Sequence, residues 1–262
     1  MKTLKMMTMT GIVVLAIGLL VLPMNADAGM GRGGGAGKGG RGNLGMQTGG
    51  SGIIANLPYQ ELSEEERDGL IQMREEEKLA RDVYLTLYET WNVGIFANIS
   101  RAEQRHMDAV KILLDKYGID DPMTDPAQGV FTSIEMQGLY DSLVEKGRQS
   151  LTDALYVGAT IEDLDIKDLY DFLEQTDNSD IKTVYQNLAK GSRNHLRAFV
   201  SQLSANGVEY EAQYLPPVDV DEIVNSPHER GPVDENGQQI GGGRGQGQGQ
   251  GFGRGMGKGG WQ

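Results

Sequence analysis

The sequence predicts an all-α protein, an up-down four-helix bundle with a long crossover and a short accessory helix between the second and third long helices. Two observations predict this fold class. Four long segments between residues 63 and 205 repeat apolar residues at three- and four-residue spacing, which is the period of an amphipathic helix. Residues 119–132, between the second and third segments, contain two prolines and one glycine, as a long crossover connection would.

The first helix is expected to begin after Ser63, because Ser63 and Glu66 have the spacing of a capping box. Its apolar face is interrupted by one carboxylate, that of Glu77. The neighbouring Glu75 and Glu76 are expected to face solvent or the edge of the bundle. The residues of this inward face are Leu70, Met73, Glu77, Ala80, Tyr84, Leu87 and Trp91.

The second helix is expected from Ser100 to about Tyr117, with Gly118 ending it. Glu103 and His106 are three residues apart and therefore share one helical face, which continues with apolar residues. Burying such polar groups is costly unless a partner satisfies them, and a cation suits a Glu-x-x-His pair in a bundle. An alternative explains Glu103 alone: Ser100 and Glu103 also have the spacing of a capping box.

The remaining helices are expected at 133–146 (the accessory helix), 151–175 and 180–205, the last capped by Asn178 or Ser179. The third long helix has Glu162 and Asp165 in the middle of its inward face, where neither can act as a cap. The inward face of the fourth contains His195. It runs through Ile181, Tyr185, Leu188, Ser192, His195, Phe199 and Leu203.

Residues 1–28 have the features of a secretory signal peptide: Lys2 and Lys5, the apolar run 11–22, and a small-x-small site at 26–28. The alternative is an uncleaved N-terminal anchor, although the run is short for a membrane span. We therefore expect an exported protein (periplasmic, cell-surface or extracellular) with no stable membrane insertion after cleavage. The absence of cysteine excludes disulfides, thiolate nucleophiles and iron-sulfur clusters, so any metal must be bound by Glu, Asp and His.

Residues 29–52 and the end of the chain are glycine-rich and basic, and we expect them to be disordered. An alternative role for them is weak association with anionic surface polymers. The folded domain is expected at 53–214, and 215–262 is expected to be a proline-containing acidic linker, with His228 in a loop, followed by a disordered tail. The chain has a net charge of −13 although its flanks are basic, so the part between the flanks is strongly acidic. This charge argues against nucleic-acid binding by the folded part.

Four helices thus each place ligand-type side chains on an otherwise apolar face. A single buried polar residue is usually satisfied by a neighbour. Four carboxylates with two imidazoles in one bundle would instead be destabilised without cations. We therefore predict a metal site made of Glu77, Glu103, His106, Glu162, Asp165 and His195. Ligands with nitrogen and oxygen atoms suit iron and also manganese or zinc.

These residues resemble the ferritin-like superfamily, in particular its rubrerythrin-type di-iron branch. The resemblance rests on Glu77-x-x-Ala80-Arg81-x-x-Tyr84, Phe96-x-x-Ile99-x-x-x-Glu103-x-x-His106 and Glu162-x-x-Asp165. From about residue 57 to 214 the chain further resembles an uncharacterised ferritin-like family of exported prokaryotic proteins, domain of unknown function 2202. The runs that carry this second resemblance are 73–82 (MREEEKLARD) and 191–196 (GSRNHL).

The resemblance implies that Glu77, Glu103 and His106 hold one iron, with Glu103 able to bridge, and that Glu162 and His195 hold a second. Asp165 stands where the rubrerythrin-type branch has an additional switching carboxylate. Ser192 departs from the pattern, which has a bridging Glu three residues before the last His; a mononuclear site is therefore the alternative to a di-iron site.

The implied activity, if the protein is an enzyme, is oxidation of Fe(II) by oxygen or peroxide. The second hypothesis is a non-catalytic envelope protein whose metal stabilises the fold. The sequence is compatible with a homodimer.

Overall fold

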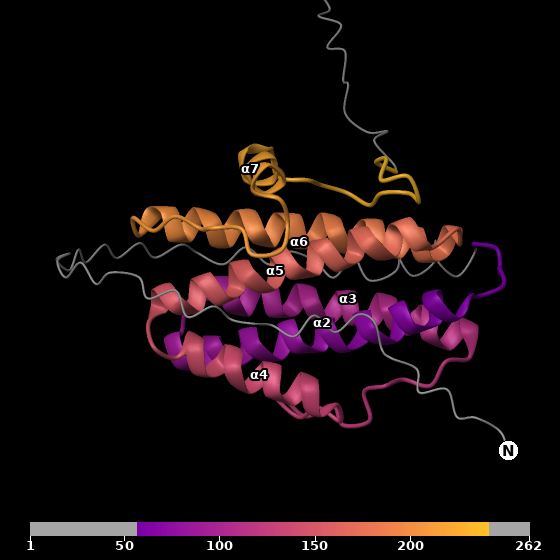
Figure 1. Ribbon diagram of the computed structural model, residues 1–262, viewed down its shortest axis with the longest axis horizontal. Helices are drawn as coiled ribbons and strands as arrows, with labels where there is room; N and C mark the ends of the chain where they lie inside the picture. The colour runs from indigo at the N-terminus through magenta and orange to yellow at the C-terminus, as the bar shows by residue number, and fades with distance from the viewer. Residues whose placement is uncertain (1–56, 241–262) are drawn as a thin grey trace, which may run out of the picture.

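The computed structural model describes residues 57–240, and this part of the chain is helical, as expected for an all-α bundle. Its one piece of β pairing is an isolated bridge between Val233 and Gln239. The helices, labelled as in Figure 1, are α2 (Glu64–Trp91), α3 (Gly94–Tyr117), α4 (Ile134–Gly147), α5 (Leu151–Gln175), α6 (Ser179–Ala205) and α7 (Pro217–Asn225).

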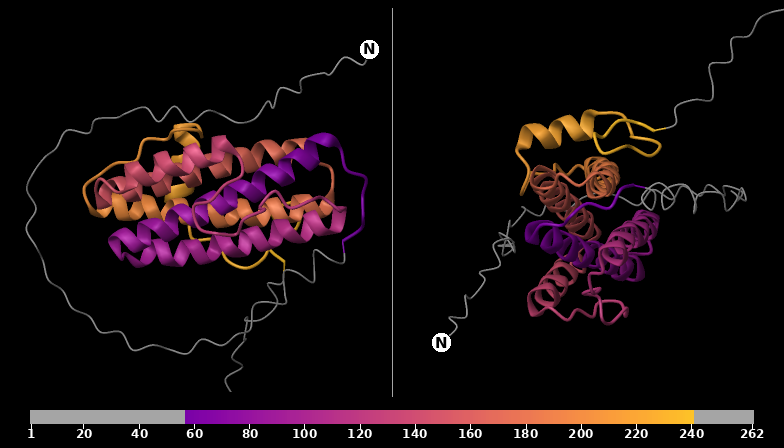
Figure 2. Two further views of the ribbon diagram at one scale, coloured as in Figure 1. Left: turned by 90° about the horizontal axis from the view of Figure 1, so that it is seen from below. Right: turned by 90° about the vertical axis from the view of Figure 1, so that its right-hand side faces the viewer.

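The four long helices form two layers. Figures 1 and 2 show α2 beside α3 in one layer and α5 beside α6 in the other, with α4 on the far side of α2 and α3 and with α7 lying across the outer side of α6. Short connections join α2 to α3 and α5 to α6, whereas the crossover from α3 to α5 contains α4. The expected accessory helix is therefore present between the second and third long helices. The specifically ferritin-like arrangement remains a prediction.

The helix starts agree with the sequence signals at α2 and differ at α3. Ser63 and Glu66 form both hydrogen bonds of a capping box. In contrast, α3 begins at Gly94, so Ser100 lies inside the helix and its hydroxyl donates to the backbone carbonyl of Ala97 at 3.3 Å. The capping-box alternative for Glu103 is therefore wrong, and the Glu103 carboxylate is available to the core.

A polar layer divides the apolar core into two parts along the bundle axis. One part contains Tyr84, Leu87, Phe96 and Phe199 among its fully buried side chains. The other contains Leu70, Met73, Val110, Leu169 and Tyr185. On each long helix the predicted metal ligands lie at or beside the change from one part to the other. The bundle therefore buries its ligand-type side chains between two apolar core clusters.

Buried charges on α2 hold the crossover in place. The Lys78 ammonium donates to the carbonyls of Ala127 and Val130, each at 3.0 Å, and pairs with Asp82 at 2.6 Å. Asp82 in turn accepts from the backbone N–H of Gly129 at 2.9 Å. Because these side chains are almost fully buried and fully partnered, they fix the loop against the helix that carries Glu77.

Residues 215–240 differ from the expected linker. They contain α7, which buries Val220 and Ile223 against the bundle, and a following segment that buries Val233. Glu229 in this segment pairs with Arg193 at 2.6 Å and with Arg197 at 3.0 Å, both on α6. The segment has the composition of a linker. Its ion pairs are made with residues that are distant in sequence, so the local sequence pattern does not reveal that it is attached.

Among residues 57–240, no helix combines the length and apolar character needed to cross a membrane. The predicted signal peptide, the glycine-rich segment 29–52 and the tail beyond residue 240 lie outside the described residues.

Candidate metal centre

Two sets of carboxylate and imidazole groups meet in the polar layer. The first set is Glu77, Glu103 and His106, and the second is Glu103, Glu162 and His195. Within each set the potential ligand atoms lie within 4.8 Å of one another. The Glu103 carboxylate is shared by both sets, so the two form one centre to which all four long helices contribute.

Glu103 lies between the two imidazoles. Its Oε2 atom is 2.7 Å from Nδ1 of His106, and its Oε1 atom is 2.8 Å from Nδ1 of His195. The outer carboxylates complete each set, with Glu77 3.2 Å from Nδ1 of His106 and Glu162 3.4 Å from Nδ1 of His195. The two ring planes are inclined by 26°, with centroids 5.7 Å apart. Each imidazole therefore directs the same nitrogen at its carboxylates.

Several of these buried atoms lack a hydrogen-bond partner. They are Glu77 Oε1, Glu103 Oε1 and His195 Nδ1. The last two are close together, but their orientation does not make a hydrogen bond. Buried polar atoms are normally paired, and unpaired ones that gather at one place need an explanation such as a bound water or ion. A cation that accepts lone pairs from all of them would satisfy these atoms, so the donor set fits a metal.

The electrostatics of the centre show how strongly it favours positive charge. Burial raises the pKa of Glu77 well above its usual range, and burial followed by the charge of Glu162 raises the pKa of Asp165 to about 8. Burial opposes ionisation of Glu103 as well, but the two imidazoles outweigh it and hold the pKa of Glu103 below its usual range. Burial would lower the pKa of His195, yet Glu103 and Glu162 raise it to about 10.

These pKa shifts reflect the excess of buried carboxylates in the centre. Protons on the imidazoles supply positive charge that the buried carboxylates require, and a metal ion would supply the same charge more effectively. Binding of metal would therefore compete with binding of protons at the same nitrogen atoms.

Of the six predicted ligands, five lie in the two sets and Asp165 lies beside them. The hydroxyl of Ser192 lies within hydrogen-bond distance of the Asp165 carboxylate and of the backbone carbonyl of Leu188 (3.2 Å), so its single proton is shared between these two acceptors. Ser192 is fully buried. It thus partners Asp165 at the position where the resemblance would place a further carboxylate.

Two side chains near the centre were not predicted. Tyr84 is fully buried, and its hydroxyl donates to Glu162 at 2.6 Å, which orients the outer carboxylate of the second set. Its position on the inward face was visible in the sequence, but a tyrosine there is usually core. Glu76 lies deeper than expected. Gln72 donates to one of its carboxylate oxygens at 2.8 Å, and the other is buried without a partner.

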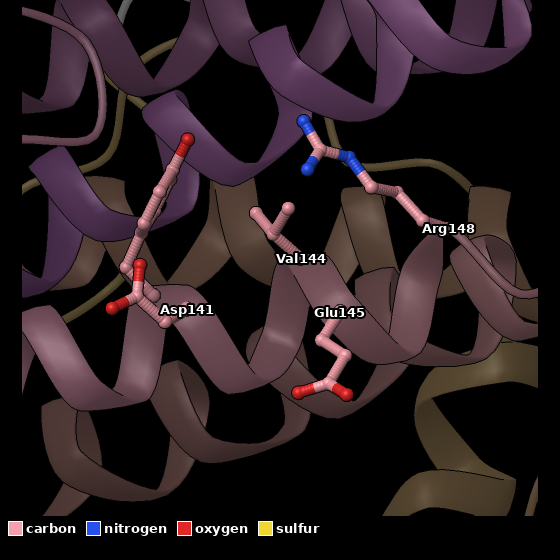
Figure 3. Close-up of a pocket in the computed structure, with 5 residues that line it drawn as sticks. Asp141, Val144, Glu145 and Arg148 are labelled. Carbon is pink, nitrogen blue, oxygen red and sulfur yellow. The ribbon is translucent and has the colours of Figure 1, made fainter.

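The described residues also contain a shallow hollow on α4, shown in Figure 3. It is lined by Tyr140, Asp141, Val144, Glu145 and Arg148. Asp141 and Glu145 are exposed to solvent, unlike the carboxylates of the two sets. None of the predicted ligands lines the hollow, so it is not part of the centre.

The fold and the buried centre together define a class, an all-α bundle whose core offers carboxylates and imidazoles that could hold a metal. The chain belongs to the DUF2202 family, described as an uncharacterized protein domain, which matches residues 66–227. The match includes the whole of α7 and so ends beyond the expected domain end at residue 214.

A relative in Methanocaldococcus jannaschii, the uncharacterized protein MJ0754, is 58% identical over 178 residues, which are 68% of this chain and 96% of the relative. The crystal structure of hypothetical protein MJ0754, also 58% identical, matches 66% of this chain and 99% of that chain with a TM-score of 0.65. The similarity therefore covers the bundle and nearly the whole of the relative.

Proposed function

We propose that this protein is an exported, ferritin-like metal-binding protein whose buried centre holds iron and oxidises Fe(II) with oxygen or peroxide. The observation that carries the proposal is the sharing of Glu103, which offers one carboxylate oxygen to each imidazole-containing set. A carboxylate placed in this way can hold two cations close together and reduce their mutual repulsion. Export is supported by the character of residues 1–28.

The residues of the chain have separable roles in this proposal. Glu77 and His106 would hold one metal ion, Glu162 and His195 a second, and Glu103 both. Bound iron would supply the electrons that reduce oxygen or peroxide. Tyr84 holds Glu162 in place through its hydrogen bond. The apolar core clusters on either side of the centre limit the access of water. Asp165, held by Ser192, lies beside the centre as a further carboxyl group.

The proposal is tested with protein purified without chelator from a host that exports it. Elemental analysis should find iron bound to the chain. When protein loaded anaerobically with Fe(II) at a defined ratio is exposed to air, oxygen uptake should exceed that of the same Fe(II) solution without protein. Bound iron without added oxygen uptake would contradict the catalytic part of the proposal.

A second candidate function is a structural metal site in a non-catalytic envelope protein. Ser192 favours it, because a hydroxyl stands where the resemblance would place a second bridging carboxylate. In this case manganese or zinc would serve as well as iron. Metal removal should then lower the melting temperature strongly, while Fe(II) bound by the protein should be oxidised in air no faster than free Fe(II).

A further inference from the structure

Gly191, in the middle of α6, lies against the imidazole of His106 on α3. A Cβ atom at position 191 would be 2.5 Å from Nε2 of His106 and 2.6 Å from Cε1. Real Cβ atoms essentially never come this close to other heavy atoms. Since the backbone of Gly191 is helical, no left-handed conformation requires a glycine here. Glycine is also a poor helix former, so its presence needs another physical reason.

The position of the His106 ring supplies that reason. On its Nδ1 edge the ring meets Glu103 Oε2 at 2.7 Å and Glu77 Oε2 at 3.2 Å. On its Nε2 edge it meets the backbone of α6 at the one residue without a side chain. The ring therefore lies between the carboxylates and α6, and its Nε2 edge is the part that a side chain at position 191 would displace. A methyl group at position 191 would have to turn the ring out of the gap between α3 and α6.

We propose that Gly191 is a positioning residue for the metal centre: its missing side chain leaves the space that directs Nδ1 of His106 at Glu77 and Glu103. The inference deepens the proposed function and rests on it. It also predicts selectivity between the two sets, because His195 lies on the same helix as Gly191 and none of the nearest contacts of a Cβ at position 191 belongs to it. The set that contains His106 should lose affinity, and the set that contains His195 should not.

The test uses Gly191→Ala in the full chain, with Co(II) as the probe metal. Two glycines of α4 provide matched controls. Gly138→Ala places a methyl group in open space and so reports the effect of helix propensity alone. Gly147→Ala places one 2.6 Å from a methyl of Leu87 and so reports a steric clash away from the centre. We expect Gly191→Ala to weaken binding of the Co(II) ion at the set that contains His106 at least tenfold, to leave binding at the other set unchanged, and both controls to bind like the wild type.

A double-mutant cycle assigns the effect to one set. Combined with His106→Ala, Gly191→Ala should cause no further loss of Co(II) affinity, because the ring that it displaces is already gone. Combined with His195→Ala, it should cause its full loss. Equal effects in both backgrounds would overturn the assignment. If Gly191→Ala alone does not fold, the double variant with His106→Ala should restore folding, since removing the ring removes the clash; failure to restore it would also overturn the proposal.

A measurement without metal separates this inference from the proposed function. In metal-free protein labelled with ¹⁵N-histidine, Gly191→Ala should shift the imidazole nitrogen signals of His106 far more than those of His195. A wild type that binds no metal would contradict the proposed function, while the histidine signals would still test the placement of the ring. Unchanged His106 signals together with unchanged Co(II) binding would overturn the role of Gly191.

Discussion

At the scale of single residues, His106 and His195 share the carboxylate of Glu103, whereas the third histidine of the chain, His228, does not contact it. His106 and His195 are mostly buried and face carboxylates, whereas His228 is exposed in the segment after α7. The inward placement of five predicted ligands followed from helical periodicity. The roles of Tyr84, Glu76 and Gly191 could not be predicted in this way, because each depends on distances between helices.

Replacing either buried histidine by Ala should therefore remove metal. We expect His106→Ala and His195→Ala to weaken metal binding by more than about tenfold, since even changes to the partners of ligands have effects of that size. His228→Ala is the control and should bind like the wild type. Metal content after dialysis against a weak competitor is the measurement. Equal loss in all three variants would contradict the ligand assignment.

Ser192 offers a second test at this scale. Ser192→Glu should direct a carboxylate to the site from the same turn of α6 that carries His195, raising the affinity for a second iron and the rate of Fe(II) oxidation. Ser192→Gln is the matched control, with similar size and no charge. If Ser192→Glu only destabilises the bundle, then Asp165 or Glu76 already supplies the additional carboxylate and the added charge is buried without benefit.

At the scale of elements, helix ends were predictable where the signal was a local one. Ser63 capped α2 as expected, and the third long helix has the predicted bounds, 151–175. The start of α3 was missed because Gly94 follows the short connection after α2 and its N-cap, Val93, makes no side-chain hydrogen bond. The segment after α7 was missed because its attachment depends on Arg193 and Arg197, which face it from another element.

The attachment of this segment should weaken in acid. Burial alone would raise the pKa of Glu229, but Arg193 and Arg197 hold it below its usual range. A carboxyl group whose pKa is lower in the folded state stabilises that state above its unfolded pKa, near 4.3, and loses the effect as the pH falls through the folded value. The protection factors of the amides in residues 226–240, which correct for the intrinsic slowing of exchange in acid, should therefore fall below about pH 4.

Glu229→Gln separates this ion pair from general acid effects. At neutral pH it should accelerate amide exchange in residues 226–240 while leaving exchange in α2 unchanged. Glu222→Gln, on the exposed side of α7, is the control and should have no effect. Equal exchange of residues 226–240 in wild type and Glu229→Gln at neutral pH would show that the pair with Arg193 and Arg197 does not hold the segment.

At the scale of the whole molecule, the packed unit is larger than the sequence indicated. The bundle class followed from four amphipathic segments and a long crossover. The end of the unit did not, because Val220 and Ile223 lie in a short acidic stretch that begins with two prolines, and Val233 stands alone beyond it. Their burial is visible once α6 is placed beneath them.

Two shortened chains test the extent of this unit. A chain of residues 53–240 should melt like the mature protein, because the packed contacts are retained. A chain of residues 53–214 should lose on the order of a few kcal/mol of stability, or about 5–10 °C in Tm, because four buried apolar side chains (Leu215, Val220, Ile223 and Val233) and the ion pairs of Glu229 are removed. Equal melting of the two chains would contradict this, as would a lower Tm for the longer one than for the mature protein.

The division of ligands between the two helical hairpins has a consequence for the order of assembly. Glu77 and His106 are 29 residues apart and lie with Glu103 in the α2–α3 hairpin, so the first set closes with a short loop. The second set needs the α5–α6 hairpin to dock on Glu103, a contact between distant parts of the chain. Local contacts generally form faster than distant ones. During folding, we therefore expect the N-terminal hairpin to capture its cation first, and docking of the C-terminal hairpin to complete the pair.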